Sequence, residues 1–446
     1  MLAASATAAL ALPTPAGAAG AIFPGSGSDA YDVSDYALSL SIANRDRRFG
    51  GRVTISATGR RDAERVSLDA GANLRIASVT RNGEPVEFLH RRTKLTLALS
   101  QVQGEGWQVT IRYRGRIKPL FDGEGTPYGW VRDGRHNWLA LTEPAVTRVL
   151  MPVNDTPADQ ASYRFSIGVP RSYVGVANGR LISRTVDRGR PRFVWKLDGE
   201  IPPYAAVVGS GRWRLFHRAG GSVWNVARKK RDLGGLRHLG RYQRFLEARL
   251  GEHPYDASGG IALPSAPFAL ETATRPVYWT RPGGAIIVHE MVHDWFGNSV
   301  SIADWRQIWL NEGPATWFEW LWGAHKGTRS IRAQITRPWC RYRNDWDFPT
   351  AEPGPRDDIF SSVNVYWRGG LVMELLRRKV GTGRFLEILR RWTTENRFEA
   401  VDTSEFIALA EQVAGESLSE IFSPYLYGTK PIWPTELMGF RHRCRG

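Results

Sequence analysis

IIVHEMVHDWFGNSVSIADWRQIWLNEG, residues 286–313, combines an apolar helical pattern with two imidazoles and a carboxylate. His289 and His293 interrupt the apolar run, and Glu290 stands between them. On a helix, positions i and i+4 project from one face, so both histidines can reach a single cation while Glu290 lies beside it. A solvent-facing histidine pair fits the apolar neighbours badly, because unpaired imidazoles and a carboxylate are costly to bury. The HExxH spacing is therefore interpreted as a zinc-hydrolase motif.

A third metal ligand is expected from the same stretch. FGN at residues 296–298 predicts the end of the first helix, and a loop follows through residues 301–304. WRQIWLNEGPATWFEWLW has the composition of a second helix that folds back beside the first and brings Glu312 towards the histidines. Two His and one Glu with an open fourth position are typical of catalytic zinc rather than structural zinc. Glu319 lies two helical turns beyond Glu312, where it either accepts a hydrogen bond from a ligating imidazole or is an ordinary solvated carboxylate.

The chain of 446 residues carries a formal net charge of +16, with 52 Arg and eight Lys against 44 acidic residues. The arginines are scattered in short clusters, without the basic helix or interleaved aromatics of a nucleic-acid-binding protein. We therefore expect a solvated, arginine-rich surface with a background affinity for polyanions and no specific nucleic-acid site. No apolar stretch approaches the roughly 18 to 20 residues of a membrane-spanning helix.

The N-terminal segment and the two cysteines bear on the compartment. Residues 1–29 open with a short apolar stretch and continue with small residues of A-x-A type, as the back half of a secretory signal does. The basic start of such a signal is missing, because the first basic residue is Arg45. We expect a secreted or exported protein, with a cytoplasmic location as the alternative. Cys340 and Cys444 allow a single bridge, which the sequence does not decide.

Two regions of different character follow the leader. Residues 30–215 read as short strands, such as WQVTIRYRGRI (107–117) with apolar residues at every second position. Asn-Gly pairs at 82–83 and 178–179 predict tight hairpins. The pattern favours an N-terminal antiparallel β saddle or sandwich domain. Residues 216–446 form a mainly helical domain in this interpretation, beginning with a helix that Gly251 ends.

The motifs closely resemble one known family. HEMVH, then eighteen residues, then the Glu of WLNEG resembles the aminopeptidase N-like family of gluzincin zinc metallopeptidases. The family patterns H-E-x-x-H-x-W-F-G-N and D-W-x-x-x-W-L-N-E-G stand here as HEMVHDWFGN and DWRQIWLNEG. The resemblance covers about residues 30–428 and includes further segments: ALTEPAVTRVLMPVNDTPADQASYRFSIGVP (140–170), FALETATRPVYW (268–279) at the G-x-M-E-N amine motif, and SVNVYWRGG (362–370) at the V-Y-x-K-G-A stretch.

The resemblance implies a fold and a function. The fold would be α+β multidomain, a β saddle followed by a thermolysin-like catalytic domain, in a short form without the family's C-terminal helical domain. The function would be that of a zinc-dependent aminopeptidase with one Zn²⁺ per chain and peptide substrates. We expect the protein to act as a monomer. The implied site residues are the zinc ligands His289, His293 and Glu312, the general base Glu290, the oxyanion donor Tyr366, and the amine-binding Glu143 and Glu271.

Several positions depart from the family pattern. The amine motif keeps Glu271 but has Thr272 in place of the usual Asn, and Leu141 replaces the usual Gln near Glu143. Pro314 stands where the family has an apolar residue that can donate its N–H, so it would kink a helix unless it lies near the first turn. Two alternatives therefore stay open. One is a zinc endopeptidase or epoxide hydrolase on the same site, and the other is a non-catalytic binding protein that retains the fold.

Overall fold

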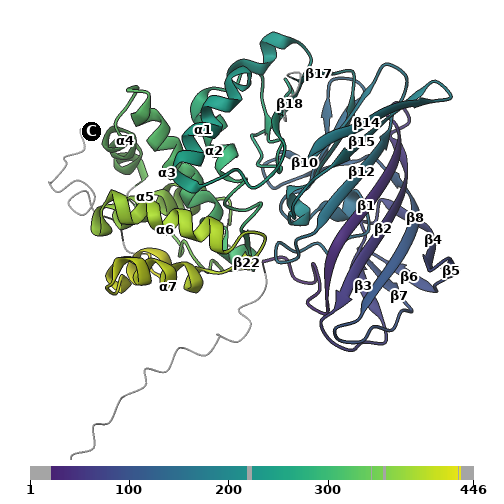
Figure 1. Cartoon of the computed structure of the whole chain (residues 1–446), viewed down its shortest axis with the longest axis horizontal. Coiled ribbons are helices and arrows are strands. Elements are labelled where there is room, and N and C mark those ends of the chain that lie inside the picture. Colours follow the sequence, from purple (N-terminus) through teal and green to yellow (C-terminus); the bar gives the residue numbers. More distant parts are fainter. Residues whose placement is uncertain (1–21, 218–222, 343, 355–357, 430, 433–446) are drawn as a thin grey trace, which may run out of the picture.

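The computed structural model describes residues 22–217, 223–342, 344–354, 358–429 and 431–432. The N-terminal part consists of β-sheets and the C-terminal part mainly of helices, which confirms the predicted order of β domain and helical domain (Figure 1). Residues 1–21 of the expected leader lie outside the described residues, as does Cys444. Cys340 is disulfide-bonded. Among the described residues, none of the helices combines the length and apolar character needed to span a membrane.

Three sheets build the β domain. An eight-stranded sheet has the order β14 (Arg180–Asp187), β15 (Arg190–Lys196), β12 (Ser162–Gly168), β1 (Tyr31–Ala43), β2 (Arg48–Gly59), β8 (Gly106–Arg116), β4 (Leu74–Arg81) and β5 (Glu84–Pro85). A five-stranded sheet has the order β13 (Val174–Ala177), β16 (Val207–Gly211), β11 (Asn137–Leu141), β10 (Pro127–Asp133) and β9 (Pro119–Phe121). A three-stranded sheet consists of β3 (Val66–Asp69), β7 (Lys94–Leu97) and β6 (Phe88–Arg91). Most neighbours in these sheets are antiparallel, but β1 and β12 run parallel.

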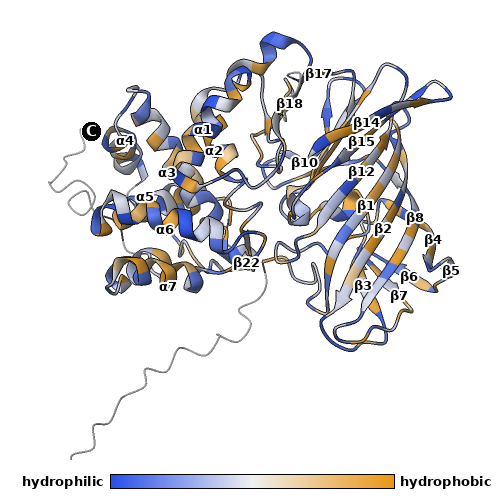
Figure 2. Ribbon diagram, viewed as in Figure 1, coloured by the Kyte–Doolittle hydropathy of each residue, from blue (hydrophilic) through white to orange (hydrophobic). Residues whose placement is uncertain are grey.

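The long strands of the large sheet are amphipathic. In β8, Trp107, Val109, Ile111 and Tyr113 are buried, and the residues between them are polar and mostly exposed. This is the alternation predicted for residues 107–117, and the colours of Figure 2 show it as orange and blue bands along β2 and β8. Side chains of a strand alternate between the two faces of a sheet, so one face is buried and the other faces solvent.

The two Asn-Gly pairs have different roles. Asn82 and Gly83 have φ angles of 52° and 92° and join β4 to β5, so the predicted hairpin is confirmed. The hairpin predicted at Asn178-Gly179 is wrong, because β13 and β14 belong to different sheets. The Asn178 amide is buried and donates to the carbonyls of Ala205 and Ala273, and Gly179 lies so close to Lys196 that a Cβ would come within 2.0 Å of its carbonyl oxygen. Asn178 and Gly179 therefore connect the five-stranded sheet, which contains β13, to the eight-stranded sheet, which contains β14.

The C-terminal part contains a small mixed sheet of β17 (Arg214–His217), β18 (Val223–Ala227), β19 (Ser258–Ala262) and β20 (Val277–Tyr278). Its α-helices are α1 (Leu239–Leu250), α2 (Gly284–Val292), α3 (Trp309–His325), α4 (Ile331–Tyr342), α5 (Arg368–Val380), α6 (Thr382–Glu395), α7 (Thr403–Ala414) and α8 (Ser419–Phe422). Short 3₁₀ or π segments occur in both parts of the chain. The β domain has η1 (Thr147–Val149) and η2 (Pro203–Ala205), and the C-terminal part has η3 (Lys230–His238), η4 (Trp305–Gln307), η5 (Ser362–Trp367) and η6 (Ser423–Tyr427). The strands β21 (Ser301–Ile302) and β22 (Ala400–Val401) pair in parallel.

Two predicted helix ends can be compared with the structure. Gly251, with a φ of 91°, follows the last residue of α1 as predicted. The first helix of the opening stretch ends earlier than residues 296–298, because α2 stops at Val292. After that residue the Asp294 N–H bonds the Met291 carbonyl, and the tighter i to i+3 spacing ends the α-helical pattern. Gly297, with a φ of 116°, then turns the chain towards β21.

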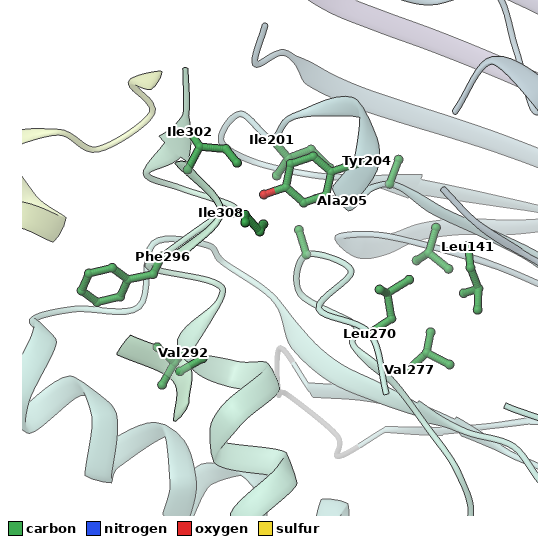
Figure 3. Close-up of a cluster of buried hydrophobic side chains, with 14 of the residues drawn as sticks. Leu141, Ile201, Tyr204, Ala205, Leu270, Val277, Val292, Phe296, Ile302 and Ile308 are labelled. Carbon is green, nitrogen blue, oxygen red and sulfur yellow. The ribbon is translucent and has the colours of Figure 1, made fainter. Parts of the chain in front are cut away.

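The two parts share a continuous apolar core. Leu141, Ile201, Tyr204 and Ala205 come from the β domain and lie in one cluster with residues of the helical part (Figure 3): Leu270, Val277, Val292, Phe296, Ile302 and Ile308. Burial of apolar surface is the main favourable contribution to folding. The sequence segments that carry the candidate site therefore pack directly on the β domain.

A buried arginine also crosses this junction. The Arg275 guanidinium donates to the Gly179 carbonyl at 2.8 Å and the Trp224 carbonyl at 3.2 Å, and it also bonds the Ala177 carbonyl. Its charge lies 4.5 Å from the centre of the Trp195 ring. Burial lowers the pKa of Arg275 to about 9. One side chain thus connects the end of β13, the start of β14 and the sheet of the helical part.

Asp155 gives the β domain a defined pH dependence. Burial and the nearby Asp69 carboxylate raise the pKa of Asp155 to about 7. An unfolded carboxyl titrates near about 3.9, so between pH ~4 and 7 the folded state binds more protons and the free energy of unfolding falls as pH rises. Asp155→Asn should make the fall in the free energy of unfolding between these pH values smaller, by at most about 4 kcal/mol. Urea unfolding at pH 4.5 and 7.5 measures it, with exposed Glu64→Gln as control. A parallel pH dependence of stability in Asp155→Asn and the wild type would contradict the prediction.

Candidate metal centre and active site

α2 and α3 pack against each other, as the fold-back of the second helix predicted. Pro314 is the sixth residue of α3, so the helix lacks the backbone bond to the carbonyl four residues earlier. Gly313 lies against Gly369 of α5, and a Cβ on Gly313 would come within 3.1 Å of that backbone. The missing side chain allows α3 and α5 to approach closely. This contact fixes the distance between Glu312 on α3 and the segment that carries Tyr366.

His289, His293 and Glu312 form a buried cluster of three potential metal donors. The Nε2 atom of His289 lies 3.4 Å from Oε2 of Glu312, and Nε2 of His293 lies 3.6 Å from the same oxygen. Two donors held at about 2.1 Å by a tetrahedral zinc ion are about 3.4 Å apart. The Glu312 Oε2 atom is buried without a hydrogen bond of good geometry among the described residues. Both observations fit a zinc ion between the three side chains.

The remaining ring nitrogens face acceptors. Nδ1 of His293 lies 3.1 Å from the Phe296 carbonyl, and Nδ1 of His289 lies 3.5 Å from Oε2 of Glu319. In the neutral imidazole that binds a metal, a proton on Nδ1 leaves the Nε2 lone pair free for the cation. Glu319 is 38% exposed, in contrast to the buried Glu312. The position of Glu319 fits the predicted support of His289.

The charges of the cluster are strongly coupled. Burial alone would raise the pKa of Glu312, but His293 and His289 lower it to about 2. Burial would lower the pKa of His293, whereas the carboxylates of Glu312 and Glu271 raise it to about 9. The site therefore holds Glu312 as an anion under all ordinary conditions. An anionic oxygen beside two imidazoles is a donor set that zinc prefers.

Three further carboxylates converge on the same space. Glu271 and Glu290 each place an oxygen within 4.8 Å of a ring nitrogen of His293. Burial raises the pKa of Glu290 to about 8, and burial also raises the pKa values of Glu143 and Glu271. Repulsion from Glu271 contributes to the shift of Glu143, so these two lie close together. The structure thus gathers the predicted base and both predicted amine-binding residues around the metal donors.

Glu143 and Glu271 are incompletely satisfied. The Oε1 atom of each is buried and accepts no hydrogen bond among the residues that the structure describes. Buried polar atoms are almost always paired in proteins. Thr272, which replaces the usual Asn, donates its hydroxyl to the Arg275 carbonyl at 2.9 Å and so does not share this space. The two carboxylates are therefore suited to a cationic ligand that carries several N–H donors.

Tyr366 lies beside His289. Its ring is parallel to the imidazole, with 6.0 Å between the centroids and 3° between the planes. It belongs to the π-helical segment η5, and such segments are frequent at functional sites. Burial, followed by the charges of Glu312 and Glu271, raises the pKa of Tyr366 well above its usual range. The phenol consequently keeps its proton and remains a hydrogen-bond donor.

The structure adds residues that the sequence interpretation did not assign. Asp294 accepts from the Thr274 N–H at 2.9 Å and lies 2.9 Å from the buried ring of His253. Asn298 donates to the Glu271 carbonyl and to Asp294, which fixes the backbone that carries Glu271. The only feature of the sequence that could have pointed to Asp294 is its charge, directly after His293 in an apolar run. No spacing rule connects it to His253, 41 residues earlier.

A β domain followed by a helical domain, with two His and one Glu on adjacent helices, defines a zinc metallohydrolase. Two family profiles match the chain: the peptidase M1 N-terminal domain over residues 31–204 and the peptidase family M1 domain over residues 271–425. The chain therefore belongs to the M1 family of zinc metallopeptidases. The family confirms the fold class, the class of enzyme and the zinc cofactor expected from the sequence.

One solved structure and two curated proteins illustrate the similarity. An M1 zinc metallopeptidase from Deinococcus radiodurans, solved by crystallography, has a TM-score of 0.84 and 25% identity over 93% of this chain and 98% of its own. Leucine aminopeptidase 2 of Yarrowia lipolytica is 24% identical over 84% of this chain and 63% of its own length. Probable aminopeptidase 1 of Sulfurisphaera tokodaii is 22% identical over 84% of this chain and 50% of its own length. The chain thus spans less than two thirds of these two aminopeptidases.

Proposed function

We propose that the protein is a zinc-dependent aminopeptidase that removes N-terminal residues from peptides. The observation that carries the proposal is the buried pair Glu143 and Glu271, each with an unpaired oxygen among the described residues, beside the three metal donors. The pair supplies acceptors for an α-ammonium group, which a free peptide N-terminus has and a blocked one lacks. A bound cation favours the charged form of both carboxyls and so opposes the rise of their pKa values on burial. The names of the two aminopeptidases and the M1 fold agree with this proposal.

His289, His293 and Glu312 would hold the ion. A bound zinc ion supplies Lewis acidity at the scissile carbonyl and lowers the pKa of a coordinated water to about 7. The chain itself contributes the geometry: both imidazoles turn Nε2 towards one oxygen of Glu312, and His293 is oriented by the Phe296 carbonyl. A catalytic zinc site has three protein ligands and keeps its fourth position open, and these three side chains would supply the ligands.

Glu290 is the general base of the proposed mechanism. It lies next to His289 in sequence and within reach of the His293 ring. A base works best when its pKa is near the operating pH, and burial shifts the pKa of Glu290 towards that range. Its carboxylate takes the proton of the attacking water and later passes that proton to the departing amine nitrogen. Both transfers use one side chain on a rigid helix.

Tyr366 is the proposed donor to the negative charge that develops on the carbonyl oxygen. Its ring lies beside His289, and its proton is retained because its pKa is raised. A preorganised donor of this kind typically contributes about 3 to 4 kcal/mol in the transition state. The π-helical turn of η5 holds the phenol without relying on a flexible loop.

Recognition of the free N-terminus provides the direct test of the proposal. For matched peptides with free and N-acetylated termini, we expect kcat/KM to be roughly 10³-fold or more higher for the free peptide. The physical reason is that an acetylated nitrogen leaves two buried carboxylates without their cation. Glu143→Gln should reduce this ratio, because it removes one of the two charges but keeps the side-chain volume. Equal cleavage of both peptides would contradict the proposal and favour endopeptidase action.

A further inference from the structure

The exposed face of the eight-stranded sheet carries a dense group of arginines. Each side chain in the group is exposed and belongs to one of three adjacent strands, β2, β8 and β4. This arginine face consists of Arg48 and Arg52 on β2, Arg112, Arg114 and Arg116 on β8, and Arg75 on β4. The sequence interpretation expected arginines scattered over a solvated surface, and the structure gathers these six, all exposed, on one face. Strand pairing brings together residues that are up to 68 positions apart.

The register places the arginines opposite one another. Arg48 pairs with Arg116 and Arg52 with Arg112 across β2 and β8, and Arg75 pairs with Arg114 across β4 and β8. Directly opposite residues of antiparallel strands have Cβ atoms about 4.5–5.5 Å apart and point to the same face. Like charges in such positions destabilise a sheet. The arrangement is therefore unfavourable for the fold alone.

Acidic residues do not compensate this charge. The sequences of β2, β4 and β8 contain no Asp or Glu. None of the six arginines forms an ion pair with any acidic residue in the described part of the chain, although many other arginines do. The next strand, β1, presents Ser39 opposite Arg52 and Ser41 opposite Gly50. Arg192 of β15 reaches over both serines, so the positive surface continues across β1.

The chemistry of the face also limits the partner. Its three strands carry none of the large exposed apolar side chains of the described residues, and those of the same sheet, Ile182 and Val186, lie on β14 at its edge, beyond β1, β12 and β15. Bases of single-stranded nucleic acid would find no aromatic ring for stacking, and a bilayer would find no apolar side chain to insert. Guanidinium groups bind phosphate in a bidentate manner. Along β8 they recur every second residue, about 7 Å apart, which suits anionic groups that repeat along a chain.

We infer that the arginine face is a docking surface for a linear polyanion with repeating phosphate groups, bound through its charges alone. Figure 1 shows β2, β8 and β4 on the opposite side of the molecule from α2 and α3, the helices that position the metal donors, so an occupant of the face does not cover the metal centre. The inference rests on strand register and charge and is independent of the proposed peptidase activity.

Long-chain inorganic polyphosphate provides the test. Its affinity for the full chain is measured by fluorescence anisotropy at 50 and 200 mM NaCl. For single strands, the logarithm of the binding constant falls by about 0.7 per phosphate contact for each tenfold rise in salt. Six contacts therefore give a slope of about −4, so the affinity should fall roughly 300-fold between the two salt concentrations. The triple variant Arg112→Gln, Arg114→Gln, Arg116→Gln should bind at least about tenfold more weakly at 50 mM and halve the slope to about −2.

A matched variant separates the face from net charge. Arg237→Gln, Arg244→Gln, Arg384→Gln removes the same charge from exposed positions in the helical part and should retain wild-type affinity. Arg48→Gln, Arg52→Gln provides a second variant of the face on β2. Neither variant of the face should lower the unfolding temperature, because both remove like-charge pairs. Equal losses in face and control variants, unchanged binding by both face variants, or tighter binding to anionic lipid vesicles at equal phosphate concentration would overturn the inference.

Discussion

Replacement of Glu290 by glutamine is expected to lower kcat by roughly 10²- to 10⁴-fold while one zinc ion per chain remains bound. Glutamine fills the same buried volume but cannot accept the proton of the attacking water. The three metal donors, His289, His293 and Glu312, are untouched by the change. Turnover of a peptide with a free N-terminus and zinc content by elemental analysis are measured on the same preparation.

The neighbouring carboxylate Glu319 provides a control for this experiment. Glu319 also lies beside His289, but it is 38% exposed and lies against Nδ1, whereas Nε2 of His289 faces Glu312. Glu319→Gln should therefore reduce activity far less than Glu290→Gln. Near-normal turnover by the Glu290→Gln enzyme would show that another group takes the proton. Absence of zinc from the Glu290→Gln enzyme would show instead that Glu290 is part of the metal site.

Glu312→Gln should have the opposite pattern, with loss of the metal followed by loss of activity. Its Oε2 atom is the point on which both imidazoles converge, at 3.4 and 3.6 Å, and its charge sustains the raised pKa of His293. Changes to residues that only support ligands already reduce metal affinity 10- to 100-fold, so loss of a ligand should cost at least about 10²-fold. Competition with a zinc-binding dye measures this affinity.

Glu374 is a matched control for the removal of a buried carboxylate. It lies on α5, accepts from Arg377 and Arg378, and is not among the metal donors. Glu374→Gln should lower stability yet retain wild-type zinc affinity. Dialysis of the wild type against a chelator should reproduce the activity loss of Glu312→Gln, and added zinc should reverse it only in the wild type. Full activity after metal removal would contradict the proposed mechanism.

The metal donors could be predicted because they obey short-range rules. His289 and His293 are one helical turn apart, and a single fold-back between two helices brings in Glu312. Tyr366, Glu143 and Glu271 could be assigned only through the resemblance, because nothing in their spacing requires them to meet. Their approach depends on how three distant segments, η5, the end of β11 and the stretch before β20, come together in the fold, which local sequence patterns do not determine.

Long-range pairing explains what the sequence interpretation missed. The Asn178-Gly179 pair has the composition of a hairpin turn, but the buried amide of Asn178 is used to join two sheets. The arginine face depends on a register between β2 and β8 that individual strands do not reveal. His253 and Asp294 meet only in the folded chain. In each case the decisive contact joins residues that are distant in sequence.

Glu143 follows β11 in the β domain, whereas Glu271 precedes β20 in the helical part, only four residues before the buried Arg275 that ties the two parts together. In the proposed mechanism, the acidic site for the substrate N-terminus therefore combines one carboxylate from each half of the molecule. A catalytic half produced by itself would keep all three metal donors yet lack the means to select free N-termini. The proposal also implies that substrate enters without a large hinge rotation, because parting the two halves would separate Glu143 from Glu271.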